Sequence, residues 1–312
     1  MRAFALWLSL ATAFAAVDGT VQNRTTGKPQ AGATVLLFKL GQAGPEMLAS
    51  TKSDAEGRFS FAQAVEGEAH LIEAAHEGVT YNLMLPPGTP AANLEVEVFD
   101  SSKQPGHARL VQHMVLLEPT GQQLSVSETF LFNNDGNLTY HDPAHGTLRF
   151  FVPEAAKDSL KVMAQAPQGM PVERAAEPAG QPGVYKLNFA IKPGETQVNL
   201  IYSVPLSDPA RFTGKVLYEG LATDLVVPNG LGLDGEGLDL RGTVPGSRAK
   251  VYRVQNASYG IEIGEASDDA SNEPTPIWPY KVYDRLPWIL IPTFLALALG
   301  FILLYRRGEQ RG

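Results

Sequence analysis

The residues best able to do chemistry lie in one short segment, in which Asp142 stands between His141 and His145. Two imidazoles and a carboxylate within five residues could bind a divalent metal ion. Pro143 and Gly146 predict a loop here, so the two histidines lack the helical register of many metal-binding pairs. Two interpretations remain: a polar loop between strands, or a metal site in a metal-dependent hydrolase or metal-binding protein.

The other four histidines are weaker candidates. His107 or His113 could add a ligand to the loop. His70 and His76 are in phase with a predicted strand and could face a groove, although partly buried structural histidines are the simpler interpretation.

The acidic segments are poor candidates for a metal site, and the known catalytic motifs do not occur. Asp234, Glu236 and Asp239 crowd three carboxylates together, but they lack the ligand spacing of an EF-hand. Asp54 and Glu56 fall at a predicted hairpin tip. The chain has no nucleophile elbow, no Walker loop and no glycine-rich loop that opens a helix. We therefore predict a protein that is not an enzyme and that needs no cofactor.

Composition limits the fold and the partners. The chain has 312 residues and no cysteine, which excludes a disulfide-stapled scaffold and thiolate metal sites. The formal net charge is −8, and it becomes more negative when the arginines of the two ends are left out. Because nucleic acid demands a basic surface, this acidic balance argues against it as a partner.

Residues 1–15 predict a signal peptide. Arg2 precedes an apolar run, and Ala13-Phe14-Ala15 places small residues at the cleavage positions. A first transmembrane helix is the alternative, but the run is too short for a hydrocarbon core of about 30 Å.

Residues 287–305 predict a single transmembrane helix. These 19 residues carry no charge, and at ~1.5 Å per residue they match the thickness of one bilayer core. Trp288 and Tyr305 would lie at the two interfaces, and Arg306 and Arg307 follow directly. The positive-inside rule places the basic tail, residues 306–312, in the cytoplasm.

Between these ends the sequence predicts an all-β protein. Short alternating runs separated by turn residues fill residues 16–103, for example Arg58-Phe59-Ser60-Phe61. A linker over 101–106 leads to a second β-sandwich region, residues 108–264, which could be one sandwich or two. An acidic, proline-rich stalk over 265–286 then leads to the membrane helix.

The second β region has its own predicted strands. Four Val-Pro pairs follow apolar runs, and their prolines should end strands because proline cannot donate to a ladder: Pro153, Pro205, Pro228 and Pro245. The predicted strands are 108–117, 123–132, 148–152, 159–165, 184–191, 196–204, 212–217, 222–227 and 250–254.

The first β region resembles a known family. The pattern G-x-V-x-N-x-x-T-G-x-P-x-x-G-x-x-V-x-L runs from Gly19 to Leu37, and S-D-x-x-G-x-F-x-F runs from Ser53 to Phe61. Both are similar to the carboxypeptidase regulatory-like domain. The resemblance implies a seven-strand sandwich of the prealbumin type, a fold often grouped with carbohydrate-binding-like domains, and it says little about function.

The second β region also carries a resemblance. The segments VPEA (152–155), YKLNFAIKPGETQ (185–197) and IYSVP (201–205) resemble a group of uncharacterised bacterial envelope proteins. Those proteins pair this region with a regulatory-like domain and end in one membrane span. The resemblance implies an architecture and a compartment, but no established activity.

Together these features predict a non-catalytic binding module on the outer side of the bacterial cytoplasmic membrane. Its β domains would be periplasmic or at the cell surface, and its C-terminus would be cytoplasmic. The expected partner is a glycan or another protein of an envelope complex, because loops on a rigid sandwich commonly serve recognition. The alternative is the metal-dependent hydrolase that uses His141, Asp142 and His145.

Overall fold

The computed structural model describes residues 16–42, 44–64, 68–244 and 246–265. These residues form an all-β protein, as predicted, and their only helical element is the 3-10 turn η1 (Glu154–Ser159). Within these ranges no helix has the length and apolar character needed to cross a bilayer. The predicted signal peptide, membrane helix and basic tail, including Trp288, Tyr305, Arg306 and Arg307, lie outside the described residues, as does all of the stalk except Glu265.

The chain divides into two compact units, which we describe separately. Of the described residues, unit 1 takes those within Met1–His113, Ser127–Ser203 and Val216–Leu221, and unit 2 takes those within Met114–Val126, Val204–Lys215 and Ala222–Gly312. The domain boundaries expected from the sequence, near residues 103 and 108, stay predictions.

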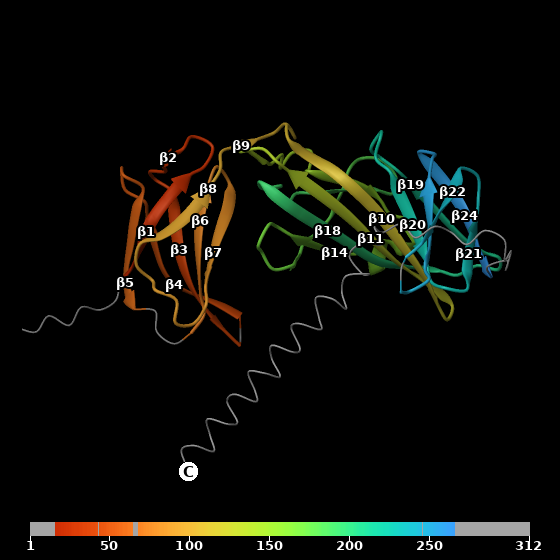
Figure 1. Ribbon diagram of the computed structural model, residues 1–312, viewed down its shortest axis with the longest axis horizontal. Helices are drawn as coiled ribbons and strands as arrows, with labels where there is room; N and C mark the ends of the chain where they lie inside the picture. Colours follow the sequence, from red (N-terminus) through yellow and green to blue (C-terminus); the bar gives the residue numbers. More distant parts are fainter. Residues whose placement is uncertain (1–15, 43, 65–67, 245, 266–312) are drawn as a thin grey trace, which may run out of the picture. The chain divides into compact units, whose positions relative to one another are not determined.

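The N-terminal part of unit 1 contains two four-stranded sheets (Figure 1). In the first sheet β1 pairs with β5 and β2 antiparallel and with β8 parallel. In the second sheet the order is β4-β3-β6-β7. The strands are β1 (Ala16–Asn23), β2 (Lys28–Pro29), β3 (Thr34–Gly41), β4 (Gly44–Lys52), β5 (Arg58–Ala64), β6 (His70–His76), β7 (Val79–Leu85) and β8 (Leu94–Val98).

One hydrophobic core joins these two sheets. Alternate residues of most of these strands point inward, and the buried ones form a single cluster that includes Val17, Leu37 and Ile72. Phe59 and Phe61 both enter this core from β5, as the alternation in the sequence predicts, and their ring centroids are 5.9 Å apart.

Gly19 allows β1 and β8 to approach closely. A Cβ atom at this position would lie 2.4 Å from the carbonyl oxygen of Leu94 and 2.8 Å from Cζ of Phe59. Both distances are far below van der Waals contact, so the position has room for glycine alone.

Strand β4 is an edge of the second sheet, and the sequence analysis missed it. Its residues are mostly exposed, and Met47 leaves 60% of its surface accessible. The segment has no clear period-2 pattern, because it packs little of its surface into the core.

The remaining part of unit 1 is built on three long strands, β10 (Ala108–Thr120), β11 (Gln123–Asn134) and β18 (Gly194–Pro205). Each of these strands is divided between the two units, and only part of it belongs to unit 1. These strands belong to a further sheet, in which the order is β15-β14-β18-β11-β10. Here β14 is Lys161–Gln165 and β15 is Val172–Glu173. A three-stranded sheet of β13 (Leu148–Phe151), β17 (Val184–Leu187) and β16 (Glu177–Pro178) belongs to the same unit. The predicted strand over 159–165 begins later than expected, because Ser159 ends η1.

The predicted linker contains a short strand. β9 (Ser101–Ser102) pairs in parallel with β12 (Thr139–Tyr140). The segment predicted as a linker over 101–106 therefore begins with two residues whose backbone groups are bonded to a distant segment.

Unit 2 is also all-β. Its strands β20 (Thr223–Val227), β23 (Lys250–Val254) and β22 (Leu238–Thr243) follow β10 in sheet order, and β19 (Ala210–Lys215), β24 (Ser258–Glu265) and β21 (Leu231–Asp234) form a separate sheet. Val226 and Val251 belong to a small core in this unit, against which Met114 and Leu116 pack. The sequence analysis predicted β19, β20 and β23 but not β21, β22 or β24.

Candidate functional site

The segment with the predicted metal ligands folds as a capped turn. Asp142 is 7% exposed, and its Oδ1 accepts the backbone N–H groups of Ala144 and His145. Its Oδ2 lies 2.8 Å from Nδ1 of His145. The hydrogen bond from His145 is the main reason why the pKa of the Asp142 carboxyl is lowered.

His141 lies apart from this pair. Its backbone N–H donates to the carbonyl of Ser102, and Cε1 of its ring lies 3.8 Å from where a Cβ atom of Gly78 would be. The structure thus brings together Asp142 and His145, and it places His141 beside the β6–β7 turn. The metal assignment for this loop stays a prediction.

The additional ligands proposed for the loop have partners elsewhere. Nδ1 of His107 lies 2.9 Å from Asp135. His113 is buried and its Nε2 lies 3.1 Å from Oε2 of Glu128.

His70 is a buried residue of β6, and its Nδ1 lies 3.0 Å from the carbonyl of Glu68. His70 and Glu73 have the H-x-x-E spacing of zinc carboxypeptidases. On a strand, however, residues three apart point to opposite faces, so this pair cannot converge on one ion.

Two of the acidic residues singled out in the sequence, Asp54 and Asp239, have partners in the structure. Oδ1 of Asp54 accepts the backbone N–H groups of Glu56 and Arg58, which closes a hairpin turn. In unit 2, Asp234 ends β21 and Oδ2 of Asp239 lies 3.2 Å from Arg241.

A second cluster of possible ligands occurs where β6 ends and β8 leaves its sheet. In the described ranges, His76, Glu77 and Asp100 are the only three residues of this kind whose ligand atoms all lie within 4.8 Å of one another. Nε2 of His76 lies 2.9 Å from Oδ1 of Asp100, and Nδ2 of the buried Asn23 donates to the same oxygen at 2.6 Å. Burial opposes ionisation of Asp100, but these hydrogen bonds outweigh it and lower the pKa of its carboxyl.

Lys192 makes a contact inside unit 1 with the N-terminal sheets. Its ammonium group donates to the carbonyl of Thr80 at 2.5 Å and lies 4.9 Å from the centroid of the Tyr81 ring. Burial lowers the pKa of Lys192 to about 8, although Glu73 acts in the opposite direction. Burial also raises the pKa of Tyr81 to about 12, even though its hydroxyl is hydrogen-bonded to Thr139.

The lowered pKa of Lys192 predicts that the stability of the fold depends on pH. Lys192 titrates near pH 8 when folded and near 10.5 when unfolded, so between these values the unfolded chain binds more protons and stability rises with pH. We expect a gain of about 1–2 kcal/mol across this window, reduced by partial solvent exposure. Thermal unfolding at pH 7.5 and 9.5 measures it. Lys192→Met should abolish the rise and the exposed-site control Lys161→Met should retain it; the same rise in Lys192→Met would contradict the assignment.

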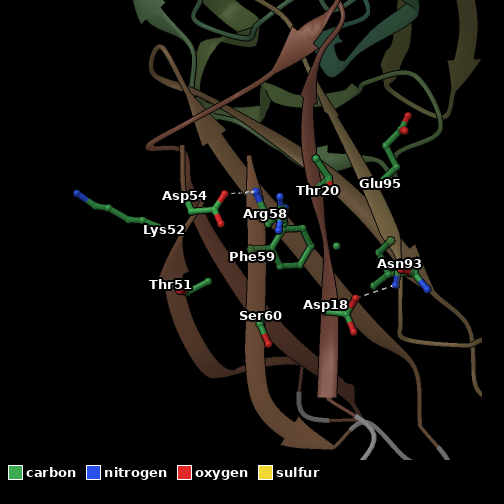
Figure 2. A pocket seen from close by; sticks show the side chains of 12 residues that line it. Asp18, Thr20, Thr51, Lys52, Asp54, Arg58, Phe59, Ser60, Asn93 and Glu95 are labelled. Carbon is green, nitrogen blue, oxygen red and sulfur yellow. Dashed lines mark hydrogen bonds between the residues drawn. The ribbon is translucent and has the colours of Figure 1, made fainter. Parts of the chain in front are cut away.

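A polar hollow lies on the N-terminal sheets. It has a volume of about 580 Å³, and its walls come from β1, β4, β5 and β8 (Figure 2). Polar side chains dominate the lining: Asp18, Thr20, Thr51, Lys52, Asp54, Arg58, Ser60, Asn93 and Glu95. Figure 2 shows Lys52 on one side, Glu95 on the other and Arg58 between them. We call this hollow the β1–β5 groove.

The charged residues of the β1–β5 groove differ in how they are paired. Asp18 accepts the N–H of Asn93, and Glu95 forms an ion pair with Arg24. Among the described residues, no carboxylate forms an ion pair with Lys52 or Arg58. Asp18 and Asp54 bond only to backbone N–H groups, so the groove presents two cations and two carboxylates that form no ion pair among the described residues. The sequence analysis missed this groove, because its lining comes from four strands that are far apart in the chain.

Comparison with known proteins gives no assignment. No model of a protein family matches this chain, and no curated protein matches it.

Proposed function

We propose that this protein is a non-catalytic, membrane-anchored module of the bacterial envelope, and that its β1–β5 groove binds an acidic glycan. The observation that carries this proposal is the groove itself, in which the side chains of Lys52 and Arg58 form no ion pair with a carboxylate of the described residues. Hydroxyl and amide groups from Thr20, Ser60 and Asn93 surround them. Such a lining suits a ligand rich in hydroxyl groups that also carries a carboxylate or a phosphate.

The proposed family is the one that the sequence resembles. Strands β1 and β3–β8 lie in two sheets that share one core, which supports a seven-strand sandwich of the prealbumin type. The residues of the family-like patterns occupy fitting positions: Gly27 and Gly32 have φ values of 71° and 73°, which favour glycine.

The proposed location rests on the two ends of the sequence. An apolar leader, a charge-free span over 287–305 and the arginines after it support a protein held in the cytoplasmic membrane with its β domains outside. Such a protein would meet envelope polymers from the outer side of that membrane.

Binding of soluble acidic envelope glycans to the full-length protein in detergent tests the proposal. The preparation starts from membranes washed with alkaline carbonate, since an anchored protein stays in the pellet. Titration calorimetry should show saturable binding. The double variant Lys52→Gln/Arg58→Gln should weaken it by at least about 100-fold, because each of the two charged hydrogen bonds contributes about 1.5–3 kcal/mol.

Lys28→Gln is the matched control for the groove variants, because Lys28 is an exposed cation on β2 of the same sheet but does not line the groove. Its affinity should equal that of the wild type. Equal loss in both variants would indicate non-specific attraction between charges. Absence of glycan binding, combined with stable co-purification of another envelope protein, would indicate that the partner is a protein and not a glycan.

A further inference from the structure

The three residues His76, Glu77 and Asp100 form a compact set of possible metal ligands that the proposed function does not use. His76 ends β6, Glu77 follows it in the β6–β7 turn, and Asp100 follows β8. One nitrogen and two carboxylate groups therefore meet at one end of the N-terminal sheets, with all ligand atoms within 4.8 Å of one another. The three side chains come from two segments that are separated in the sequence, so the fold itself assembles the set.

The backbone holds Glu77 in place. Glu77 and Gly78 have positive φ angles of 46° and 77°, and they form the tight connection between β6 and β7. Oε2 of Glu77 accepts the N–H of Ser101 at 2.6 Å. This bond joins the turn to the segment after Asp100, and it leaves the other carboxylate oxygen of Glu77 to bind an ion.

A buried amide holds Asp100 in place. Asn23 is 2% exposed, and its Oδ1 accepts the N–H groups of Thr25 and Thr26, which fixes the orientation of its amide. Its Nδ2 then donates to Oδ1 of Asp100. Metal ligands are commonly oriented by such outer hydrogen bonds, and here each of the two carboxylates has one.

We propose that His76, Glu77 and Asp100 bind one divalent transition-metal ion, with Zn²⁺ as the preferred ion. Imidazole nitrogen with carboxylate oxygen suits zinc, whereas calcium and magnesium prefer oxygen ligands alone. Binding requires the lone pair of His76 Nε2, so the imidazole of the metal-bound form would carry its proton on Nδ1. The ion would fasten the β6–β7 turn to the segment that follows β8.

This site differs from the one predicted from the sequence. Asp142 and His145 pair with each other, whereas His141 lies beside Gly78, next to Glu77 in the chain. Variants of His145 therefore separate the two possibilities, and they do not depend on the glycan proposal.

Zinc binding to the full-length, detergent-solubilised protein, purified without a polyhistidine tag, tests the inference. Equilibrium dialysis with elemental analysis should give one Zn²⁺ per chain at saturation, and zinc should raise the midpoint of thermal unfolding. Glu77→Gln and Asp100→Asn should each weaken binding by at least about 10-fold. Glu77 is exposed, so Glu77→Gln keeps the test decisive if Asp100→Asn fails to fold.

His145→Ala is the matched control and should bind zinc like the wild type. Three outcomes would overturn the inference. The first is no saturable zinc binding, and the second is zinc binding that Glu77→Gln leaves unchanged. The third is binding that His145→Ala abolishes, which would place the ion in the segment around Asp142.

Discussion

Glu128→Ala should lower the free energy of unfolding by about 3–5 kcal/mol, the usual cost of removing one partner from a buried charged group. Glu128 is 5% exposed, and both of its carboxylate oxygens are engaged. Oε2 lies 3.1 Å from Nε2 of His113, and Oε1 accepts the hydroxyl of Tyr202. Alanine would remove both contacts from side chains that water does not reach, since His113 and Tyr202 are 4% and 1% exposed.

The surroundings of Glu128 strengthen this expectation. The ring of His113 stacks on Phe130 with centroids 4.1 Å apart, so the imidazole cannot readily turn toward another partner. The three polar residues stand on β10, β11 and β18, which are neighbours in the sheet. Loss of the carboxylate would therefore disturb a buried part of unit 1 and not only its surface.

Urea unfolding followed by circular dichroism measures this effect. The control is Glu195→Ala, which removes an exposed carboxylate at the start of β18 and should change stability by less than about 0.5 kcal/mol. Glu128→Gln should cost less than Glu128→Ala, because the amide keeps a hydrogen-bonding group in place. Equal costs for Glu128→Ala and Glu195→Ala would show that the buried cluster contributes no net stability.

Gly19→Ala should lower the free energy of unfolding by about 2–3 kcal/mol, in the range found for overpacked cores. The added Cβ atom would lie 2.4 Å from the carbonyl oxygen of Leu94. That oxygen is part of the backbone of β8, which pairs with β1 over five residue pairs, so it cannot move away alone. The ring of Phe59 limits movement on the other side.

Gly41→Ala is the matched control, because Gly41 also lies on a strand of the N-terminal sheets. A Cβ atom there would meet only the carbonyl oxygen of Gly44, at 3.9 Å. Thermal unfolding should show a large decrease for Gly19→Ala and little change for Gly41→Ala. If the two variants unfold alike, β1 and β8 are less closely packed than the structure shows.

Most of the strand pattern could be predicted from the sequence, because strands with one buried face show it in the alternation of apolar residues. Phe59 and Phe61 on β5 illustrate this, as do the buried Val96 and Val98 on β8, which alternate with the exposed Glu95 and Glu97. Edge strand β4 lacks such a face and was missed. The same holds for β21, where no residue is fully buried.

The candidate sites could not be predicted to the same extent. The alternation of β11 places Glu128 on the buried face, but the sequence does not reveal that β10 and β18 are the neighbours that supply His113 and Tyr202. The cluster of His76, Glu77 and Asp100 depends in the same way on the return of β8 toward the β6–β7 turn. One signal was present in the sequence, since His76-Glu77-Gly78 puts polar residues where an alternating strand ends in a turn.

The exposed edge of β4 affects the tendency of this chain to aggregate. An open edge of a sheet can recruit a strand from another molecule, which leads to aggregation. Here Pro45 lacks an N–H donor, Glu46 adds a charge, and the pairing of β3 with β4 is interrupted by a bulge near Phe38. These features make β4 a poor template for an incoming strand, which would matter most for molecules crowded together on one surface.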